Sequence, residues 1–493
     1  MSAPKEILDY IDRTQEEGFS DEAIQEALHI AGWHKKDIHN AFVSKTPTTS
    51  RPMSPVIIII SILLFLLLGL GSAYAVFWYQ THLITQTPST TPTPTLEIIP
   101  SLTPSLTEPP QSSAPQTPLT ADVSYSHNGF GFDILKTLLK TDGENNIVLS
   151  PTSISLALSM TYNGASESTK LAMAKTLKIQ GFDIQKLNEQ SNSLIKSLTN
   201  PDPQVTLSIA NSIWAKKGIP ILPTFFTINT KYYNATIQSL DFSLDTSADT
   251  INTWVSKNTK GKIPTIVEKP IGASVVMYLI NAVYFYGSWT RAFDTALTAG
   301  RPFFLSEKNT IDQLFMKQSQ KNFLYEETDT FQAIQLPYGK NKRLSIVIFL
   351  PKTTLPAFLG QLTHATWNSW MKSFSEMEGT ILLPKFKAEY KTSLKKALST
   401  LGMAQAFTDT ADFSGMRKQK DISISDVIHK TFIDVSEKGT EAAAATSVEM
   451  KVTSFTEPKK TFTMEVNKPF FFTLVDTNTA EILFMGVIRN PRM

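Results

Sequence analysis

The segment from Glu437 to Phe455 constrains this chain most, because from residue 440 its side chains alternate in character with a period of two. One face is small or apolar, and the other carries every charge; the first comprises Thr440, Ala442, Ala444, Thr446, Val448, Met450 and Val452. This alternation predicts a β-strand with one buried face. Yet the four consecutive alanines favour a helix over a strand. Such a segment suits a loop in one state and a strand in another, and its small side chains would let it slide between two packed strands.

The string EKGTEAAAAT at residues 437–446, followed by NKPF at 467–470, resembles the reactive-loop hinge of the serpins, the serine protease inhibitor family. Further motifs in the family's order extend the resemblance from about Tyr125 to Pro491, among them NIVLSPTSISLALSMTYNGASEST, ANSIWAKKG, LINAVYFYGSWTRAFD and IHKTFIDVSEKG. The resemblance implies an α+β serpin fold over residues 122–493, with a large central β-sheet, smaller sheets and surrounding helices.

The same resemblance assigns three groups of residues. The hinge of the loop consists of Glu437, Gly439, Thr440, Glu441, Ala442, Ala443, Ala444, Ala445 and Thr446. A buried polar cluster lies beneath the sheet where it must open, and we call it the sheet-opening cluster: Ser150, Ser153, Asn281 and His429. The breach, where the loop enters the sheet, contains Trp289 and an ion pair between Glu437 and Lys385.

The function implied by the resemblance is suicide inhibition of a serine protease. The protease cleaves the loop and forms an acyl-enzyme, the cut loop inserts as a new central strand, and deacylation stalls. Two other functions stay open: a non-inhibitory serpin with a binding or structural role, and a receptor in which the domain is a ligand platform. A hinge without bulky or proline residues favours inhibition.

The bond that the protease cuts is placed by counting along the loop from Glu437 as in the family, which puts Thr453 before it and Ser454 after it. Thr453 suits an elastase- or subtilisin-like protease, because the residue before the bond fills the enzyme's first pocket. A shifted bond would change the target class: Lys451 suits a trypsin-like enzyme, and Met450 or Phe455 a chymotrypsin-like one.

Catalysis by this chain is not expected. The sequence has no G-x-S-x-G, H-E-x-x-H or Walker A motif, and it has no cysteine. His429 is the histidine of most interest, but no nucleophile or orienting acid accompanies it locally. We therefore expect no catalytic residue, no metal and no cofactor. A net charge of +2 gives no reason to expect nucleic acid as a partner, and we expect a monomer.

The first 50 residues have helical apolar spacing, with Ile7 and Ile11, then Ile24 and Leu28, then Ile38 and Phe42. They predict a small segment of three short helices, with a weak resemblance to the ubiquitin-associated fold. The alternative is a helical cap without a specific ligand.

Residues 55–79 predict a single transmembrane helix. Val56–Tyr79 has no charged residue, and at ~1.5 Å per residue it would reach ~36 Å, enough to cross a ~30 Å hydrocarbon core. Lysine and arginine precede the span and none follows until Lys136, so the positive-inside rule predicts a cytoplasmic N-terminus and an extracytoplasmic C-terminal domain. The alternative is a signal peptide cleaved after Ala75.

Residues 80–121 are rich in Pro, Thr and Ser and predict a disordered linker, since such a composition cannot bury a core. The layout and the absence of cysteine predict a prokaryotic cell-surface protein.

Overall fold

The computed structural model describes residues 5–16, 21–30, 33–45, 122–199, 201–440 and 460–492. The predicted transmembrane span 55–79, the linker 80–121 and the loop residues 441–459 lie outside these ranges, and so do the predicted cut-site residues Thr453 and Ser454. Within the described ranges, no helix has the length and apolar character needed to cross a membrane.

Three helices form in the N-terminal segment, as its apolar spacing indicates: α1 (Lys5–Glu16), α2 (Asp21–Ile30) and α3 (Lys35–Lys45). Ile7, Ile11, Ile24 and Leu28 are buried. They lie on single faces of their helices, because residues three to four positions apart share a face.

A six-stranded sheet crosses the C-terminal domain in the order β10-β11-β12-β4-β2-β3. Its strands are β2 (Val205–Lys216), β3 (Thr236–Leu240), β4 (Met277–Ser288), β10 (Phe386–Ser393), β11 (Ile428–Ser436) and β12 (Gly439–Thr440). The two-residue strand β12 is antiparallel to both of its neighbours, so β4 and β11 run parallel to each other. We take this sheet as the predicted central one because it contains β12, the start of the hinge; contrary to the prediction, it is not the larger sheet, since the second sheet has nine strands.

A second sheet has nine strands, in the order β1-β15-β14-β8-β7-β6-β9-β13, with β5 paired to β6. Its members are β1 (Ile147–Leu149), β5 (Ala299–Ser306), β6 (Asn309–Glu327), β7 (Phe331–Pro337), β8 (Leu344–Pro351), β9 (Ser375–Pro384), β13 (Thr461–Glu465), β14 (Phe470–Asp476) and β15 (Glu481–Ile488). Strands β8, β14 and β15 are buried along their whole length, as expected for interior strands rich in Ile, Val, Leu and Phe.

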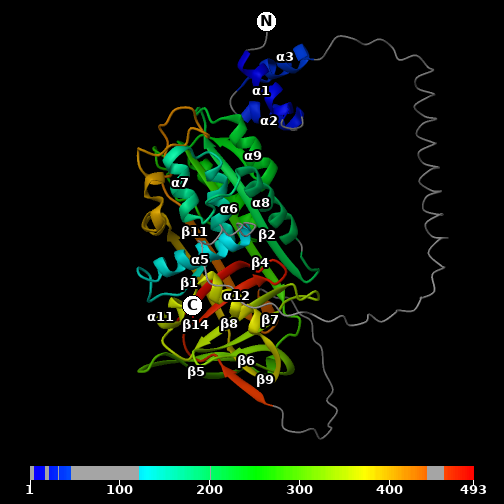
Figure 1. Cartoon of the computed structure of the whole chain (residues 1–493), viewed down its shortest axis with the longest axis vertical. Helices are drawn as coiled ribbons and strands as arrows, with labels where there is room; N and C mark the ends of the chain where they lie inside the picture. The colour runs from blue at the N-terminus through cyan, green and yellow to red at the C-terminus, as the bar shows by residue number, and fades with distance from the viewer. Residues whose placement is uncertain are drawn as a thin grey trace, which may run out of the picture. The chain divides into compact units, whose positions relative to one another are not determined.

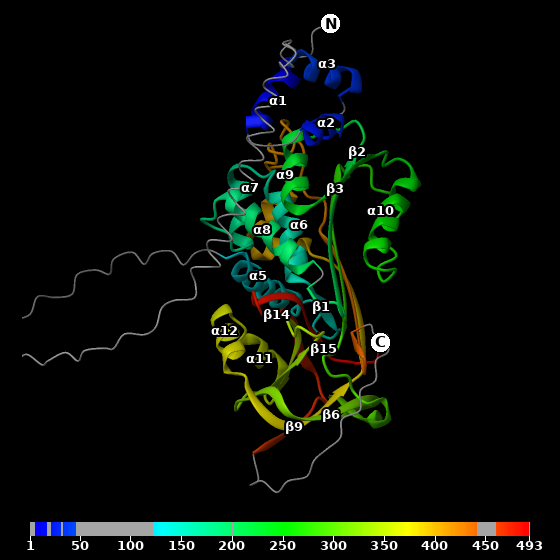
Figure 2. The ribbon, with the colours of Figure 1, turned by 90° about the vertical axis from the view of Figure 1, so that its right-hand side faces the viewer.

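Helices cover both faces of the six-stranded sheet (Figure 2). Helix α10 (Asp245–Asn258) lies on one face, and α6 (Pro151–Tyr162), α8 (Ile184–Leu198) and α9 (Pro223–Tyr233) lie on the other. The nine-stranded sheet lies toward the end of the C-terminal domain that carries α11 (Leu355–Gly360) and α12 (His364–Ser373) (Figure 1). The other helices of the described residues are α5 (Val123–Leu138), α7 (Glu167–Thr176) and α13 (Lys395–Leu398), with short turns η1 (Thr295–Leu297), η2 (Ser399–Met403) and η3 (Ala404–Phe407). The fold class is therefore α+β, as predicted.

Helix α6 lies in the interior of the domain. Nearly every one of its residues is buried, and it packs against β4 and β15. The Ser150 side chain caps its N-terminus by accepting a hydrogen bond from Ser153 N, and Pro151 occupies the first turn. Both choices fit the first turn of a helix, where backbone N–H groups lack intrahelical partners. This start brings the N-terminus of α6 directly beneath the six-stranded sheet.

Candidate functional site at the opening of the six-stranded sheet

The site begins where β12 lies between β11 and β4. Gly439 is paired with Ser436 and Ser288, and Thr440 with Val435 and Gly287. Thr440 is buried. The first two residues of the small-residue segment 439–446 thus already lie inside the sheet, and Glu441, Ala442, Ala443, Ala444, Ala445 and Thr446 come next in the chain, outside the described residues.

Gly439 is required at this point for two reasons. Its φ of 144° lies in a region that residues with a Cβ rarely adopt. A Cβ there would also lie 2.0 Å from Gly287 O. The backbone can therefore turn from β11 into the narrow space beside β4 only with glycine at residue 439.

The breach residues come together beside β12. Lys385 Nζ lies 2.9 Å from Glu437 Oε2, and Thr298 Oγ1 donates to Glu437 Oε1 at 2.9 Å. Burial pushes the pKa of Glu437 upward, but the hydrogen bonds from Lys385, the backbone and Thr298 outweigh burial and hold that pKa below its ordinary value. Trp289 is buried and its Nε1–H donates to Ser436 O at 2.8 Å. These contacts fix the point where the chain leaves β11 for β12.

The sheet-opening cluster also comes together, midway along β4 and at the start of β11. Ser150 N donates to His429 Nε2 at 3.1 Å, and Ser153 Oγ donates to Asn281 Oδ1. Asn281 Nδ2 in turn donates to Asn211 Oδ1 at 2.6 Å, which links β4 to β2. The four predicted residues therefore form one connected polar group between α6 and the sheet.

His429 does not have the surroundings of a catalytic base. Its Nε2 accepts a backbone hydrogen bond, and burial lowers the pKa of its imidazole to about 4. It is neutral at physiological pH. The described part of the chain also contains no group of three or more acidic, histidine or cysteine side chains placed to hold a metal.

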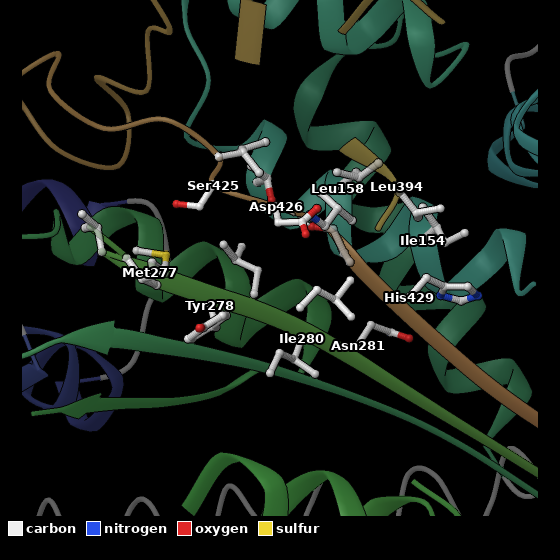
Figure 3. A pocket seen from close by; sticks show the side chains of 18 of the residues that line it. Ile154, Leu158, Met277, Tyr278, Ile280, Asn281, Leu394, Ser425, Asp426 and His429 are labelled. Carbon is white, nitrogen blue, oxygen red and sulfur yellow. Dashed lines mark hydrogen bonds between the residues drawn. The ribbon is translucent and has the colours of Figure 1, made fainter. Parts of the chain in front are cut away.

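A cavity of about 190 Å³ continues from this cluster in the gap between β4 and β11, and it is lined both by α6 and, from the opposite face of the sheet, by Ile266 and Val267 (Figure 3). Asn281 and His429 lie at one end and Met277 lies at the other, with Ile154 and Leu158 of α6 above β4. Most of its lining is apolar, including Leu279, Val427 and Ile424. The pairings of the described strands include none between β4 and β11, so β12 alone joins them, at one end.

Sequence reasoning missed Tyr338 and Thr298, which both contact the hinge. The Tyr338 hydroxyl lies 2.7 Å from Thr440 Oγ1, although the two residues are 102 positions apart. The sequence around neither residue predicts its contact with the hinge, because these contacts depend on how segments far apart in the chain pack together. Asn211 lies within one of the family-like motifs, but its bond to Asn281 was not foreseen.

Comparison with known proteins gives a consistent result. A family model described as "Serpin (serine protease inhibitor)" matches residues 125–491. An uncharacterized serpin-like protein of Methanosarcina mazei is 35% identical over 392 residues, covering 75% of this chain and 88% of the relative. Leukocyte elastase inhibitor of Bos taurus is 34% identical over 381 residues, covering 75% and 99%.

A solved structure is similar as well. The crystal structure of the thermophilic serpin tengpin in the native state matches with a TM-score of 0.68 and 33% identity, covering 74% of this chain and 94% of that one.

Proposed function

Because this chain belongs to the serpin family, whose members include leukocyte elastase inhibitor, we propose that it is an inhibitory serpin that traps a serine protease by inserting its reactive loop into the six-stranded sheet. The single observation that carries the proposal is β12. Gly439 and Thr440 already pair on both sides, between two strands of parallel direction that lack a ladder of their own. An antiparallel strand is what such a gap accepts.

The register of β12 specifies where the rest of the loop would lie. Continuing the pairing of Gly439 with Ser288 and Ser436 puts Thr446 opposite Asn281 and His429. The same continuation puts Val448 opposite Leu279 and Val427, and Met450 opposite Met277 and Ser425.

The sizes of the loop side chains fit this register. Ala442 would lie between Phe285 and Ile433, and Ala444 would lie next to Thr431, whose hydroxyl donates to Val148 O of β1. Val448 and Met450 would lie at the cavity, beside α6. Thr446 would bring a hydroxyl to the polar cluster. Fourteen residues at ~3.3 Å each would carry a tethered protease ~46 Å along the sheet.

The test is a covalent complex. The full chain is mixed with pancreatic elastase or subtilisin and run on a denaturing gel. We expect a band at the summed mass of the two proteins less that of the peptide after the cut (residues 454–493), persisting after boiling. No such band should form with a protease whose catalytic serine is replaced by alanine. Complete cleavage without a complex, with both proteases and with trypsin and chymotrypsin as well, would favour a non-inhibitory serpin.

We further propose that the inhibitor is displayed on a prokaryotic cell surface, with residues 55–79 in the membrane. The support is the uncharged span, the cationic residues before it and the Pro/Thr/Ser-rich linker after it. Protease shaving of intact cells should release a domain cut within residues 80–121. A soluble mature protein that starts at Val76 would show a cleaved signal instead.

A further inference from the structure

Tyr338 lies immediately after β7, at a point where two backbone segments are bound to each other. Tyr338 and Trp289 form an isolated antiparallel bridge, and Gly339 N donates to Ser288 O at 2.8 Å. The Tyr338 ring stacks on Trp289 with centroids 4.3 Å apart and meets the edge of Phe285 at 5.0 Å. The ring is therefore fixed in position independently of its hydroxyl.

The strand next to Tyr338 also makes room for this ring. A Cβ on Gly287 would lie 2.9 Å from Tyr338 Cδ1, so a side chain at Gly287 would displace the ring. Gly287 is the residue that pairs with Thr440. The aromatic ring and the hinge thus meet at the same point of β4.

The hydroxyl of Tyr338 points at the hinge. Tyr338 is 1% exposed and Thr440 is 3% exposed, and their hydroxyl oxygens are 2.7 Å apart. Among the described residues, Thr440 is the hydrogen-bond partner of this phenol. Burial raises the pKa of Tyr338, so the phenol stays neutral at any pH the protein meets.

We propose that Tyr338 is a positioning residue: its hydroxyl holds Thr440 between β11 and β4 before the loop is cut. A buried hydroxyl without a partner is unfavourable, so withdrawal of Thr440 from the sheet is opposed by Tyr338 as well as by the β12 ladder. The first pair of residues of the inserting strand is then already in register when the protease arrives.

This inference rests on the proposed function, and it identifies Tyr338 as the residue that keeps the first residues of the inserting strand in register. Once the acyl-enzyme has formed, insertion competes with deacylation. A hinge that is already paired removes the slowest part of strand addition, because the first pairing orders the chain for few contacts in return. Tyr338 therefore favours trapping over release of active protease.

The experiment compares five variants of the full chain with the wild type. Tyr338→Phe and Thr440→Val each remove one hydroxyl, their double variant removes both, and Thr440→Ser keeps the hydroxyl. Tyr325→Phe is the matched control, because Tyr325 is an equally buried tyrosine whose hydroxyl donates to Glu327 at 2.8 Å, and it lies in β6 of the nine-stranded sheet, whereas β12 belongs to the six-stranded one.

Two readouts are taken. Hydrogen exchange of the peptide that contains Gly439 and Thr440 should be about tenfold faster in Tyr338→Phe and Thr440→Val. The number of inhibitor molecules consumed per trapped elastase should rise about threefold in both. The double variant should show no larger effect than either single one, because only one hydrogen bond is lost and no hydroxyl is left buried without a partner. Thr440→Ser and Tyr325→Phe should match the wild type.

Unchanged hinge exchange in Tyr338→Phe, or additive effects in the double variant, would overturn the inference. A wild-type protein that forms no covalent complex would refute the proposed function instead, while the exchange result would still decide whether Tyr338 holds the hinge.

Discussion

The two ends of the gap between β4 and β11 are built differently. At the end near Trp289, β12 fills the gap, and Gly439 and Thr440 have partners on both sides. At the end near Met277, a cavity of about 190 Å³ lies in the gap itself and is lined mostly by apolar side chains. The filled end fixes the register of an incoming strand, whereas the empty end provides unfilled apolar surface that a strand could bury.

This difference separates two properties that a trap needs. In the proposed mechanism, the contacts at Thr440 and Glu437 would decide whether insertion starts correctly, and they exist before the loop is cut. The contacts at the cavity would form only at the end, so they would supply stability that the intact molecule lacks. The sheet-opening cluster lies between the two ends and joins α6 to both strands.

The largest expected effect comes from filling the empty end. Cutting the loop should raise the thermal midpoint by roughly 10 °C or more, because several side chains become buried and a new strand is paired. Intact and loop-cleaved protein are compared by calorimetry. Equal midpoints would mean that the cavity end does not receive the loop.

Thr440→Arg attacks the filled end. The guanidinium would have to lie beside buried Tyr338 without a counter-charge, at a cost of several kcal/mol. We expect the variant to be cleaved as a substrate, with less than about a tenth of the protease trapped. The measurement is the ratio of complex to cleaved inhibitor on a denaturing gel, and full retention of the complex would contradict the proposed path of insertion.

The third prediction concerns the pH dependence of stability, which should come partly from His429, between the two ends of the gap. Its pKa in the folded state is about 4, below the ordinary value of about 6.5, so the unfolded chain takes up the proton first as the pH falls. Stability from this residue is complete above pH 6.5 and declines by about 3 kcal/mol as the pH falls to 4.

In His429→Asn this part of the pH dependence should vanish, and denaturant unfolding at pH 7 and pH 4.5 measures it. An unchanged difference between the two pH values in the variant would show that other groups account for the acid sensitivity.

The smallest expected change in stability comes from Met450→Ala, which tests whether the Met450 side chain fills the cavity after the loop inserts. It should destabilise the loop-cleaved form by about 2 kcal/mol and leave the intact form unchanged, because the side chain would be buried only after insertion. Lys451→Ala is the control, since residue 451 would face away from α6. If both variants behave alike, the register continued from β12 is wrong.

Much of the fold could be predicted from the sequence. The motifs stand in family order along residues 125–491, and the apolar spacing of residues 5–45 marks three helices. The hinge was predicted from a local alternation and the family resemblance, and of its small-residue segment 439–446 only Gly439 and Thr440 are among the described residues. By contrast, the bonds that Tyr338 and Asn211 make join strands far apart in the chain, and only tertiary packing sets them.

In the sheet-opening cluster too, the sequence indicated which residues meet but not which of their atoms form the hydrogen bonds. The resemblance named Ser150 and His429 as neighbours, but it could not say that the backbone N–H of Ser150 makes the bond while its side chain caps α6. Which atom donates depends on the geometry of the helix start.

The strands after the loop have a consequence for the cleaved molecule. A cut between Thr453 and Ser454 would separate residues 454–493, which contain β13, β14 and β15, from the rest of the chain. Strand β14 lies between β15 and β8, and β15 lies between β1 and β14, so this peptide contributes two interior strands to the nine-stranded sheet. The product would therefore behave as a tightly bound heterodimer of one large and one small chain, which keeps its size in native chromatography and separates only on denaturation.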